Sequence, residues 1–349
     1  MPFSRVALVL AALACATPAA ARAQALQELA LYRGADRPQR LAEGAKKEGT
    51  LLFYTTYPGE YTNLLIEPFA KRYGIKVTVW RARSEIVLQR VTAEARAGNP
   101  PVDVITVFAP VTEALRREGL LQEIRSPVQD ELISSAVPAH REWVAPVQHV
   151  IVQAYNTARV RKEDLPKTYQ DLLAPRWKGK LAIEGDDHEW LSSVIADLGP
   201  GGEAFFRELV ARNGISARSG HTLLTNLVAS GEVPLALAVY QYSVEQAKKK
   251  GSPIDWFTIG PALSIANGIA VPRTAPHPHA ALLFYDYVLA PEGQRTLAKI
   301  GYVPTSVRVE SPVKGLRLKV LDPATLVDEQ EASYRRFERI ILKAPQASR

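Results

Sequence analysis

Short apolar runs alternate with longer segments of helical periodicity along most of the chain. In the first part, apolar runs predict strands at 49–54, 76–80 and 102–107. Apolar residues spaced three and four positions apart predict helices at 60–73, 84–97 and about 111–118. This alternation of strand and helix favours an α/β domain with a mainly parallel sheet.

A second region repeats the pattern after residue 143. We expect strands at 147–155, 181–184 and 235–240, and a further apolar run at 262–271. Helical spacing predicts helices at 190–198, 203–213, 223–230, 243–250, 279–289, 292–300 and about 326–342, followed by a polar tail. The chain therefore reads as two α/β regions, about what its 349 residues allow.

Residues 1–25 have the pattern of a secretory signal peptide. Arg5 precedes an apolar run at 6–16 that is too short to span a bilayer, and small residues with an A-x-A cleavage pattern follow. Cys15 and Met1 are the only residues of their types, so we expect a processed chain without disulfides. No later apolar run is long enough for a transmembrane helix. The sequence predicts an exported, periplasmic protein.

Composition and motifs exclude several classes of function. Hydrophobic residues make up 47% and charged residues 23%, as in an ordinary globular protein. The 43 Lys and Arg exceed the 36 Asp and Glu only mildly and form no dense basic block, which argues against nucleic acid as a partner. No G-x-S-x-G, H-E-x-x-H or P-loop motif occurs, so we expect no enzyme and no cofactor. A secreted hydrolase on an α/β scaffold is the enzymatic alternative.

Several fragments together carry a resemblance to a known family. They are Leu52-Phe-Tyr-Thr-Thr56, Glu67 to Val77, Val102-Asp-Val-Ile105, Arg116 to Leu121, Ala154-Tyr-Asn-Thr157, Pro175 to Lys180, Ser230 to Pro234, Asn267-Gly-Ile-Ala270 and Ala290 to Gln294. In their order and spacing they resemble periplasmic solute-binding proteins of ABC importers, in the group that includes ferric-ion-binding proteins. The resemblance covers roughly residues 48–305.

The resemblance implies a two-lobe periplasmic-binding-protein fold. Each lobe would be a mainly parallel sheet flanked by helices, and crossing strands would hinge the lobes. The expected bounds are 26–143 plus about 263–310 for the N-terminal lobe, 144–262 for the C-terminal lobe, and 311–349 for a C-terminal helix and tail. The implied partners are a small-molecule or metal-chelate ligand and an ABC permease in the inner membrane, with the protein a monomer. A periplasmic module that senses a ligand and signals to a membrane receptor is the alternative, because it needs the same closing lobes.

Candidate ligand-binding residues lie just after the predicted strand ends. In open α/β sheets, ligands bind beyond the carboxyl ends of strands, where helix N-termini present free N–H groups. The candidates are Thr55, Thr56, Tyr57, Arg83, Ser84, Asp187, His188, Trp190, His221, Tyr240 and Tyr242. For most of them helix capping is the competing interpretation, and one aspartate of the segment 184–190 is expected to be a cap.

Two interpretations of the ligand stay open. Phenolates suit Fe(III), and Tyr240 and Tyr242 would share one face of an extended backbone, with Gln241 between them. The resembling family uses an adjacent tyrosine pair here, and the positions of its first-lobe ligands hold Pro58 and Phe108 in this chain. One cargo is therefore iron-related, free or chelated, bound by Tyr240, Tyr242 and the carboxylates near Asp187. The other is an organic anion held by Arg83, Ser84 and helix N-termini.

Four histidines outside these segments carry no assigned role. His277-Pro-His279 resembles a short metal-binding tract, but its place in a loop favours an exposed turn. His140 and His149 are isolated and follow no pattern.

Overall fold

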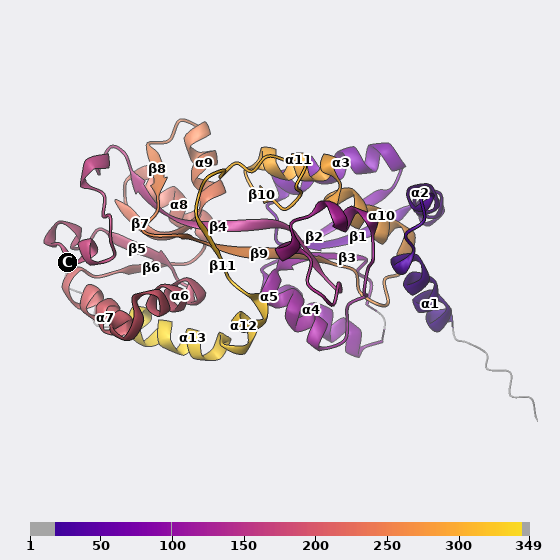
Figure 1. Ribbon diagram of the computed structural model, residues 1–349, viewed down its shortest axis with the longest axis horizontal. Coiled ribbons are helices and arrows are strands. Elements are labelled where there is room, and N and C mark those ends of the chain that lie inside the picture. The colour runs from indigo at the N-terminus through magenta and orange to yellow at the C-terminus, as the bar shows by residue number, and fades with distance from the viewer. Residues whose placement is uncertain (1–17, 99, 344–349) are drawn as a thin grey trace, which may run out of the picture.

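The computed structural model describes residues 18–98 and 100–343, with side chains from residue 24 onward. The predicted signal peptide lies largely outside the described residues. The chain forms two α/β lobes side by side, joined through one continuous sheet (Figure 1). The two-lobe fold predicted from the sequence is thereby confirmed. The residue bounds of the lobes stay a prediction, and we name the lobes here by their elements.

The N-terminal lobe is built from the first strands and the helices that cover them. Its elements are α1 (Pro18–Leu31), α2 (Arg37–Glu48), β1 (Thr50–Thr55), α3 (Gly59–Tyr73), β2 (Lys76–Arg81), α4 (Ser84–Arg96), β3 (Val104–Phe108), α5 (Ala109–Arg117), α10 (Pro278–Leu289), α11 (Pro291–Ile300) and β10 (Val303–Pro304). Strand β1 pairs in parallel with β2 and with β3. Strands β1 to β3 and helices α3, α4, α5, α10 and α11 follow the predicted ones within a few residues, whereas α1, α2 and β10 were not predicted.

The C-terminal lobe contains the second set. Its elements are β5 (Leu181–Glu184), α6 (His188–Leu198), α7 (Gly202–Asn213), β6 (Ser216–Arg218), α8 (His221–Ser230), β7 (Leu235–Tyr240), α9 (Gln241–Lys249) and β8 (Ile254–Phe257). Strand β5 pairs in parallel with β6 and β7. Strands β6 and β8 were not predicted from the sequence. Short 3-10 turns lie at Pro127–Glu131, Ser134–Ala136, Lys162–Asp164, Gln170–Leu173, Pro175–Trp177 and Gly199–Gly201.

Two long strands cross between the lobes. They are β4 (Val144–Asn156) and β9 (Ala262–Ala270), which pair with each other in antiparallel register. Strand β9 also pairs with β3 of the N-terminal lobe, and β4 with β7 of the C-terminal lobe, so the strand order is β2-β1-β3-β9-β4-β7-β5-β6. Every residue of both strands is buried. This burial explains why most of their residues are apolar on both faces; the polar residues among them, such as His149 and Asn267, are buried too.

Each lobe has its own hydrophobic core. One core joins Phe53, Phe69 and Phe284 of the N-terminal lobe, whose rings meet edge to face about the first sheet. In the C-terminal lobe, Trp190 and Phe206 belong to the core on one face of the sheet, and a smaller cluster covers the other face. Separate cores allow the lobes to behave as two bodies connected by the crossing strands.

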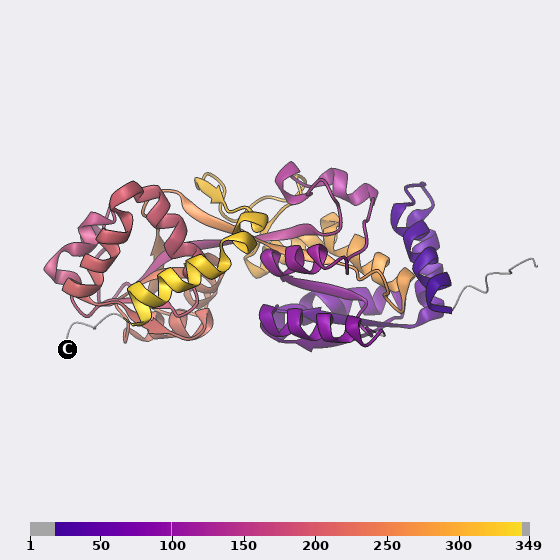
Figure 2. The ribbon, with the colours of Figure 1, turned by 90° about the horizontal axis from the view of Figure 1, so that it is seen from below.

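The C-terminal segment contacts both lobes. It comprises β11 (Leu318–Val320), α12 (Pro323–Asp328), α13 (Gln330–Phe337) and a π-helical turn at Glu338–Leu342. The expectation of a single helix at 326–342 is wrong: α12 packs on α5 and α13 on α6, so the chain bends to follow two lobes (Figure 2). Asp328 pairs with Arg117 of the N-terminal lobe at 2.5 Å, and Arg336 donates to the Ser192 hydroxyl of the C-terminal lobe at 3.1 Å.

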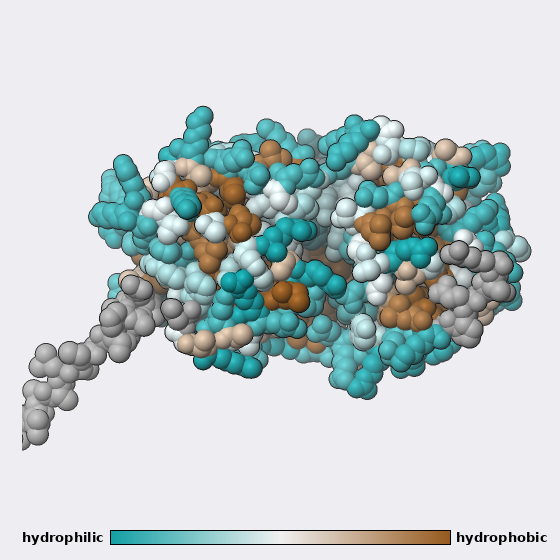
Figure 3. Space-filling view, turned by 180° about the vertical axis from the view of Figure 1, so that it is seen from behind, coloured by the Kyte–Doolittle hydropathy of each residue, from teal (hydrophilic) through white to brown (hydrophobic). Residues whose placement is uncertain are grey.

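The surface is hollowed along the line between the two lobes, as seen from behind (Figure 3). Among the described helices, none is long and apolar enough to cross a membrane.

Candidate functional site

Four tyrosine rings and one imidazole gather where the lobes meet. Tyr240 ends β7 and Tyr242 lies in the first turn of α9, and their rings stack with centroids 5.6 Å apart. Tyr302, after α11, contacts Tyr242 edge-on at 4.6 Å, and Tyr57, after β1, stacks on Tyr302 at 5.2 Å. The His149 ring on β4 lies 5.0 Å from that of Tyr240 and 5.3 Å from that of Tyr302. We call these five residues the aromatic cluster.

Tyr240 and Tyr242 share one side of the chain, as expected, but an extended backbone is not the cause. The strand ends at Tyr240 and helix α9 begins at Gln241, so the backbone is not extended across the pair. The two rings nevertheless lie nearly parallel, with an angle of 17° between their planes. A strand-to-helix transition therefore brings both phenols to the meeting line of the lobes.

A carboxylate and an imidazole extend the aromatic cluster into the C-terminal lobe. His221 is the first residue of α8, and its ring lies 4.0 Å from that of Tyr240. Its Nε2 is 3.3 Å from Oδ1 of Asp187. Asp187 occupies the N-cap position of α6, but its side chain makes no capping hydrogen bond. The carboxylate instead turns toward His221.

Several buried polar atoms at this place have no hydrogen-bond partner among the described residues. They are the Tyr57 hydroxyl, His149 Nδ1, Asp187 Oδ2, His221 Nδ1 and Asn267 Oδ1. Asn267 belongs to β9, and its Nδ2 lies 3.2 Å from His149 Nε2. Buried polar groups in proteins are nearly always paired. A concentration of unpaired ones is therefore typical of a site that binds a ligand.

Burial sets the protonation of these groups. It lowers the pKa of both His149 and His221 to about 4, so both imidazoles are neutral at pH 7. It raises the pKa of Tyr240 and of Tyr302 well above the usual value, so the phenols keep their protons. Burial, reinforced by neighbouring carboxylates, also raises the pKa of Asp187 well above its usual range. The site thus holds neutral nitrogens beside carboxylates that are costly to ionise without a cation.

The predicted loop after β1 contributes one residue to the aromatic cluster. Tyr57 lies within it, whereas Thr55 is fully buried and its Oγ1 accepts a hydrogen bond from the Tyr57 backbone N–H at 3.0 Å. The backbone N–H of Thr56 donates to the carbonyl of Thr106 at 3.2 Å. Arg81 donates to the Tyr57 carbonyl at 3.0 Å. These contacts shape the loop that presents Tyr57.

The predicted anion-binding residues are engaged with the protein itself. The Arg83 guanidinium donates to Asp186 of the C-terminal lobe at 3.3 Å and lies 3.7 Å from Glu85. The Ser84 hydroxyl accepts a hydrogen bond from the Phe108 backbone N–H at 3.3 Å. Arg83 therefore bridges the two lobes, and Ser84 ties α4 to the end of β3.

A family comparison matches this architecture over most of the chain. A family model described as bacterial extracellular solute-binding protein matches residues 54–295. The chain belongs to this family. The matched residues of this solute-binding protein run from β1 through α11, so they include both crossing strands and most of the site.

Individual relatives of this solute-binding protein share low sequence identity with it, but the alignments cover most of both chains. It is 27% identical over 290 residues to "Iron uptake protein A1" of Synechocystis sp., covering 76% of this chain and 78% of the relative. It is 24% identical over 321 residues to the "Fe(3+)-binding periplasmic protein" of Serratia marcescens, covering 87% of this chain and 94% of the relative.

Solved structures share the fold of this solute-binding protein. Iron-bound HitA from Pseudomonas aeruginosa superposes with a TM-score of 0.72 at 23% identity, covering 82% of this chain and 99% of that one. AfuA from Actinobacillus pleuropneumoniae, described with fructose-6-phosphate bound, gives 0.73 at 22% identity, covering 85% of this chain and 100% of that one. At such identities these likenesses establish the fold alone.

Trp190 and His188 are predicted site residues that contact neither the aromatic cluster nor the pair of Asp187 and His221. Trp190 is 1% exposed and packs in the core of the C-terminal lobe against Tyr169 and Phe206. It faces the core because it lies on the inner side of α6. His188 is buried, with its Nε2 3.4 Å from Glu189 and its ring edge-on to Tyr334. Of the segment 184–190, Asp187 and Glu184 are the residues that the structure brings to His221.

Sequence reasoning missed three residues of the site. They are His149, Asn267 and Tyr302, which come from β4, β9 and the loop after α11. The two strand residues are polar positions in otherwise apolar runs that cross between lobes, and that signal was available in the sequence. Tyr302 carried no signal, because only the tertiary fold brings its loop back to β4 and α9.

The remaining histidines have structural partners. His277 Nδ1 lies 3.0 Å from the buried Asp103 carboxylate, and His279 Nδ1 lies 2.8 Å from Glu48. These pairs hold the start of α10 to the N-terminal lobe, so the segment is more than the exposed turn expected from the sequence. His140 lies 3.7 Å from Glu113.

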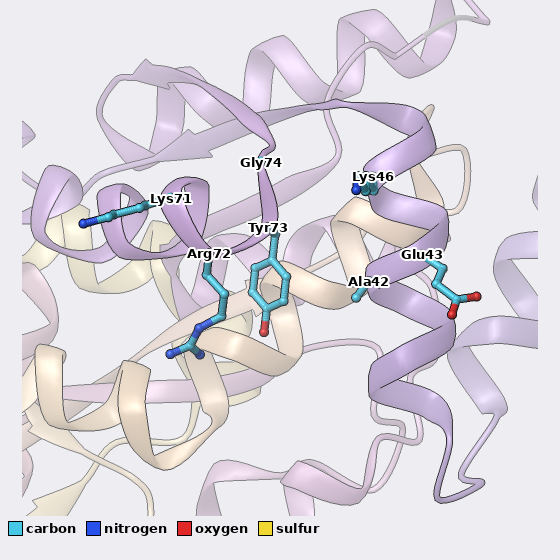
Figure 4. A pocket seen from close by; sticks show the side chains of 7 residues that line it. All are labelled: Ala42, Glu43, Lys46, Lys71, Arg72, Tyr73 and Gly74. Carbon is cyan, nitrogen blue, oxygen red and sulfur yellow. The ribbon is translucent and has the colours of Figure 1, made fainter.

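Two surface hollows lie away from the aromatic cluster. One, of about 460 Å³, lies between α2 and the end of α3, where the side chains of Arg72 and Tyr73 project side by side (Figure 4). The other, of about 490 Å³, is lined by residues that include Asp197 and Lys319. Lys319 pairs with Asp197 at 2.5 Å, and Arg72 pairs with Glu292 at 2.5 Å, so one cation of each hollow already has an acidic partner.

Proposed function

We propose that this solute-binding protein is the periplasmic capture component of an ABC importer. Its cargo is iron-related, free or chelated, and is held between the lobes by Tyr240, Tyr242 and Asp187. One observation carries the proposal: unpaired buried polar atoms from the N-terminal lobe, the crossing strands and the C-terminal lobe converge on the aromatic cluster.

The charge of the site supports a cation in preference to an organic anion. In the described part of the chain, no lysine or arginine pairs with Asp187 or Glu189; the groups within ion-pair distance are the imidazoles of His221 and His188. Burial raises the pKa of Glu189 to about 8, as expected of a carboxylate without a positive neighbour. Arg83, the cation that an anionic cargo would need, is engaged with Asp186. Of the two interpretations of the ligand, these charges therefore favour the iron-related cargo.

The relatives support import. The two described above are named for iron uptake and for binding of Fe(3+) in the periplasm. No observation favours the sensing alternative, so we do not carry it further. The predicted signal peptide, the periplasmic location, the monomeric state and the docking to a permease belong to this proposal.

Contacts between the lobes would make capture a two-state process. Arg83 bridges to Asp186, and Gln246 of α9 donates to the Ile300 carbonyl at the end of α11 at 2.7 Å. A cargo that touches both lobes adds to these contacts only in the closed state, so it shifts the population toward closure.

The test uses the mature protein purified without refolding. Ferric citrate, ferric chloride, inorganic phosphate and spermidine are titrated, and binding is followed by calorimetry, thermal shift and visible absorbance. Tyr240→Phe and Tyr242→Phe are compared with Tyr155→Phe, which removes a phenol at the far end of β4.

We expect an iron species to bind with a visible phenolate-to-iron band. Each cluster variant should weaken that band and lower affinity by more than about tenfold, whereas Tyr155→Phe should change neither. Binding of phosphate alone, or iron binding unaffected by both cluster variants, would overturn the proposal.

A further inference from the structure

Three residues of types that commonly bind metal ions lie together within the C-terminal lobe. Glu184 ends β5, Asp187 precedes α6 and His221 starts α8. One ligand atom from each of the three lies within 4.8 Å of the others. The carboxyl ends of the parallel strands and the N-termini of the following helices lie at this edge of the sheet. The fold itself therefore brings the three residues together.

The spacing of Asp187 and His221 fits a shared metal ion. Their Oδ1 and Nε2 atoms are 3.3 Å apart, which is long for a charge-assisted hydrogen bond. Metal–ligand distances of about 2.1 Å and angles of roughly 90–109° place neighbouring ligand atoms about 3.0–3.4 Å apart. The pair is therefore already spaced as two ligands of one ion.

The three side chains are held in place and still offer free atoms. Glu184 accepts hydrogen bonds from the backbone N–H groups of Asp186 at 2.6 Å and Gly220 at 2.7 Å, which fixes its carboxylate. Asp187 is 6% exposed, and its Oδ2 has no partner among the described residues. An unpaired carboxylate oxygen so deeply buried points to a missing cation.

Charge balance favours a divalent ion. Glu184 and Asp187 supply two negative charges, and a neutral His221 supplies a nitrogen donor. One imidazole with two carboxylates is a donor set suited to Mn²⁺, Fe²⁺ and Zn²⁺.

We infer that Glu184, Asp187 and His221 bind a divalent transition-metal ion on the open C-terminal lobe. This inference rests on the proposed function and specifies its cargo: the metal loads onto one lobe, and the aromatic cluster then closes over it. Tyr57 and Tyr302, which come from the other lobe, contribute to closure and not to the first contact with metal.

The test titrates the metal-free mature protein with Mn²⁺, Co²⁺ and Zn²⁺ by calorimetry, with Co²⁺ absorbance as a second readout. The variants are Asp187→Asn and His221→Gln, and the matched controls are Asp164→Asn and His140→Gln. Asp164 pairs with the exposed Arg161, and His140 belongs to the N-terminal lobe. Circular dichroism and melting establish that each variant is folded.

We expect both site variants to lower Co²⁺ affinity by more than about 100-fold and the controls by less than about twofold. Electron paramagnetic resonance of Mn²⁺ on the wild-type protein should show coupling to an imidazole nitrogen, which needs no variant. Divalent metal binding that survives both substitutions, or lacks the nitrogen coupling, would overturn the inference. Ferric citrate binding in the same wild-type preparation tests the proposed function separately, since it can persist when divalent binding is absent.

Discussion

Removal of the Arg83 side chain is expected to weaken cargo binding only slightly. Arg83 lies 3.3 Å from Asp186, and this ion pair joins the N-terminal lobe to the C-terminal lobe. Separation of the lobes would break this pair, so Arg83→Ala is expected to destabilise the closed state relative to the open one. Affinity falls by the same factor as the closed population.

The magnitude follows from the exposure of the two side chains. They are 70% and 42% exposed, and exposed ion pairs contribute about 0.2–1 kcal/mol. That range corresponds to roughly a 1.4- to 5-fold change in the dissociation constant. Glu85, 3.7 Å from the same guanidinium and in the same lobe, competes for it in both states. We therefore expect about a twofold loss.

A guanidinium that bound an anionic cargo directly would behave differently. A charge-assisted hydrogen bond to a ligand contributes about 1.5–3 kcal/mol, so its loss would lower affinity by more than about tenfold. The size of the effect thus separates a contact between lobes from a contact with the cargo.

The assay is calorimetric titration of the cargo into wild type, Arg83→Ala, Asp186→Asn and the double variant, at low and high salt. Arg161→Ala is the control, because Arg161 forms an equally exposed pair with Asp164 inside the C-terminal lobe. The coupling energy between Arg83→Ala and Asp186→Asn should vanish at high salt. A loss above about tenfold that salt does not change would contradict this and would show that Arg83 contacts the cargo directly.

Three further outcomes are expected. Trp190→Ala should lower the free energy of unfolding by about 3–5 kcal/mol in calorimetric melting, because the indole lies in the core. Trp190→Phe should still bind cargo for the same reason. Unchanged melting of Trp190→Ala would contradict this. Burial would raise the pKa of Glu113, but hydrogen bonds from two guanidiniums and an indole outweigh it and lower the pKa to about 2. Stability should fall as pH drops from about 4.5 to 2, and Glu113→Gln should flatten that dependence in acid denaturation curves; an identical pH profile in the variant would exclude the effect. Gly301→Ala should weaken cargo binding severalfold more than Gly315→Ala: both glycines have positive φ, but only at Gly301 would a Cβ meet Tyr242, at 3.3 Å. Equal binding by the two alanine variants would contradict this.

The order and type of most elements can be read from the amino-acid pattern alone. Apolar runs and helical spacing located β1, β5, β7 and their following helices to within a few residues, because local periodicity reports which face of an element is buried. The rule that ligands bind beyond strand ends also selected Tyr57, Asp187, His221, Tyr240 and Tyr242, which the structure brings near one another. These side chains follow directly from the strand ends that the pattern identifies.

Only the tertiary structure decided which of these residues meet. Trp190 and Asp187 are three residues apart, yet one packs in a core and the other turns toward His221, because the rotation of α6 against its sheet is set by packing with distant elements. His149, Asn267 and Tyr302 join the site because the crossing strands and the loop after α11 return to one place. Side chains brought together across 150 residues leave no local pattern, since their contact is created by the pairing of strands and not by the spacing of residues.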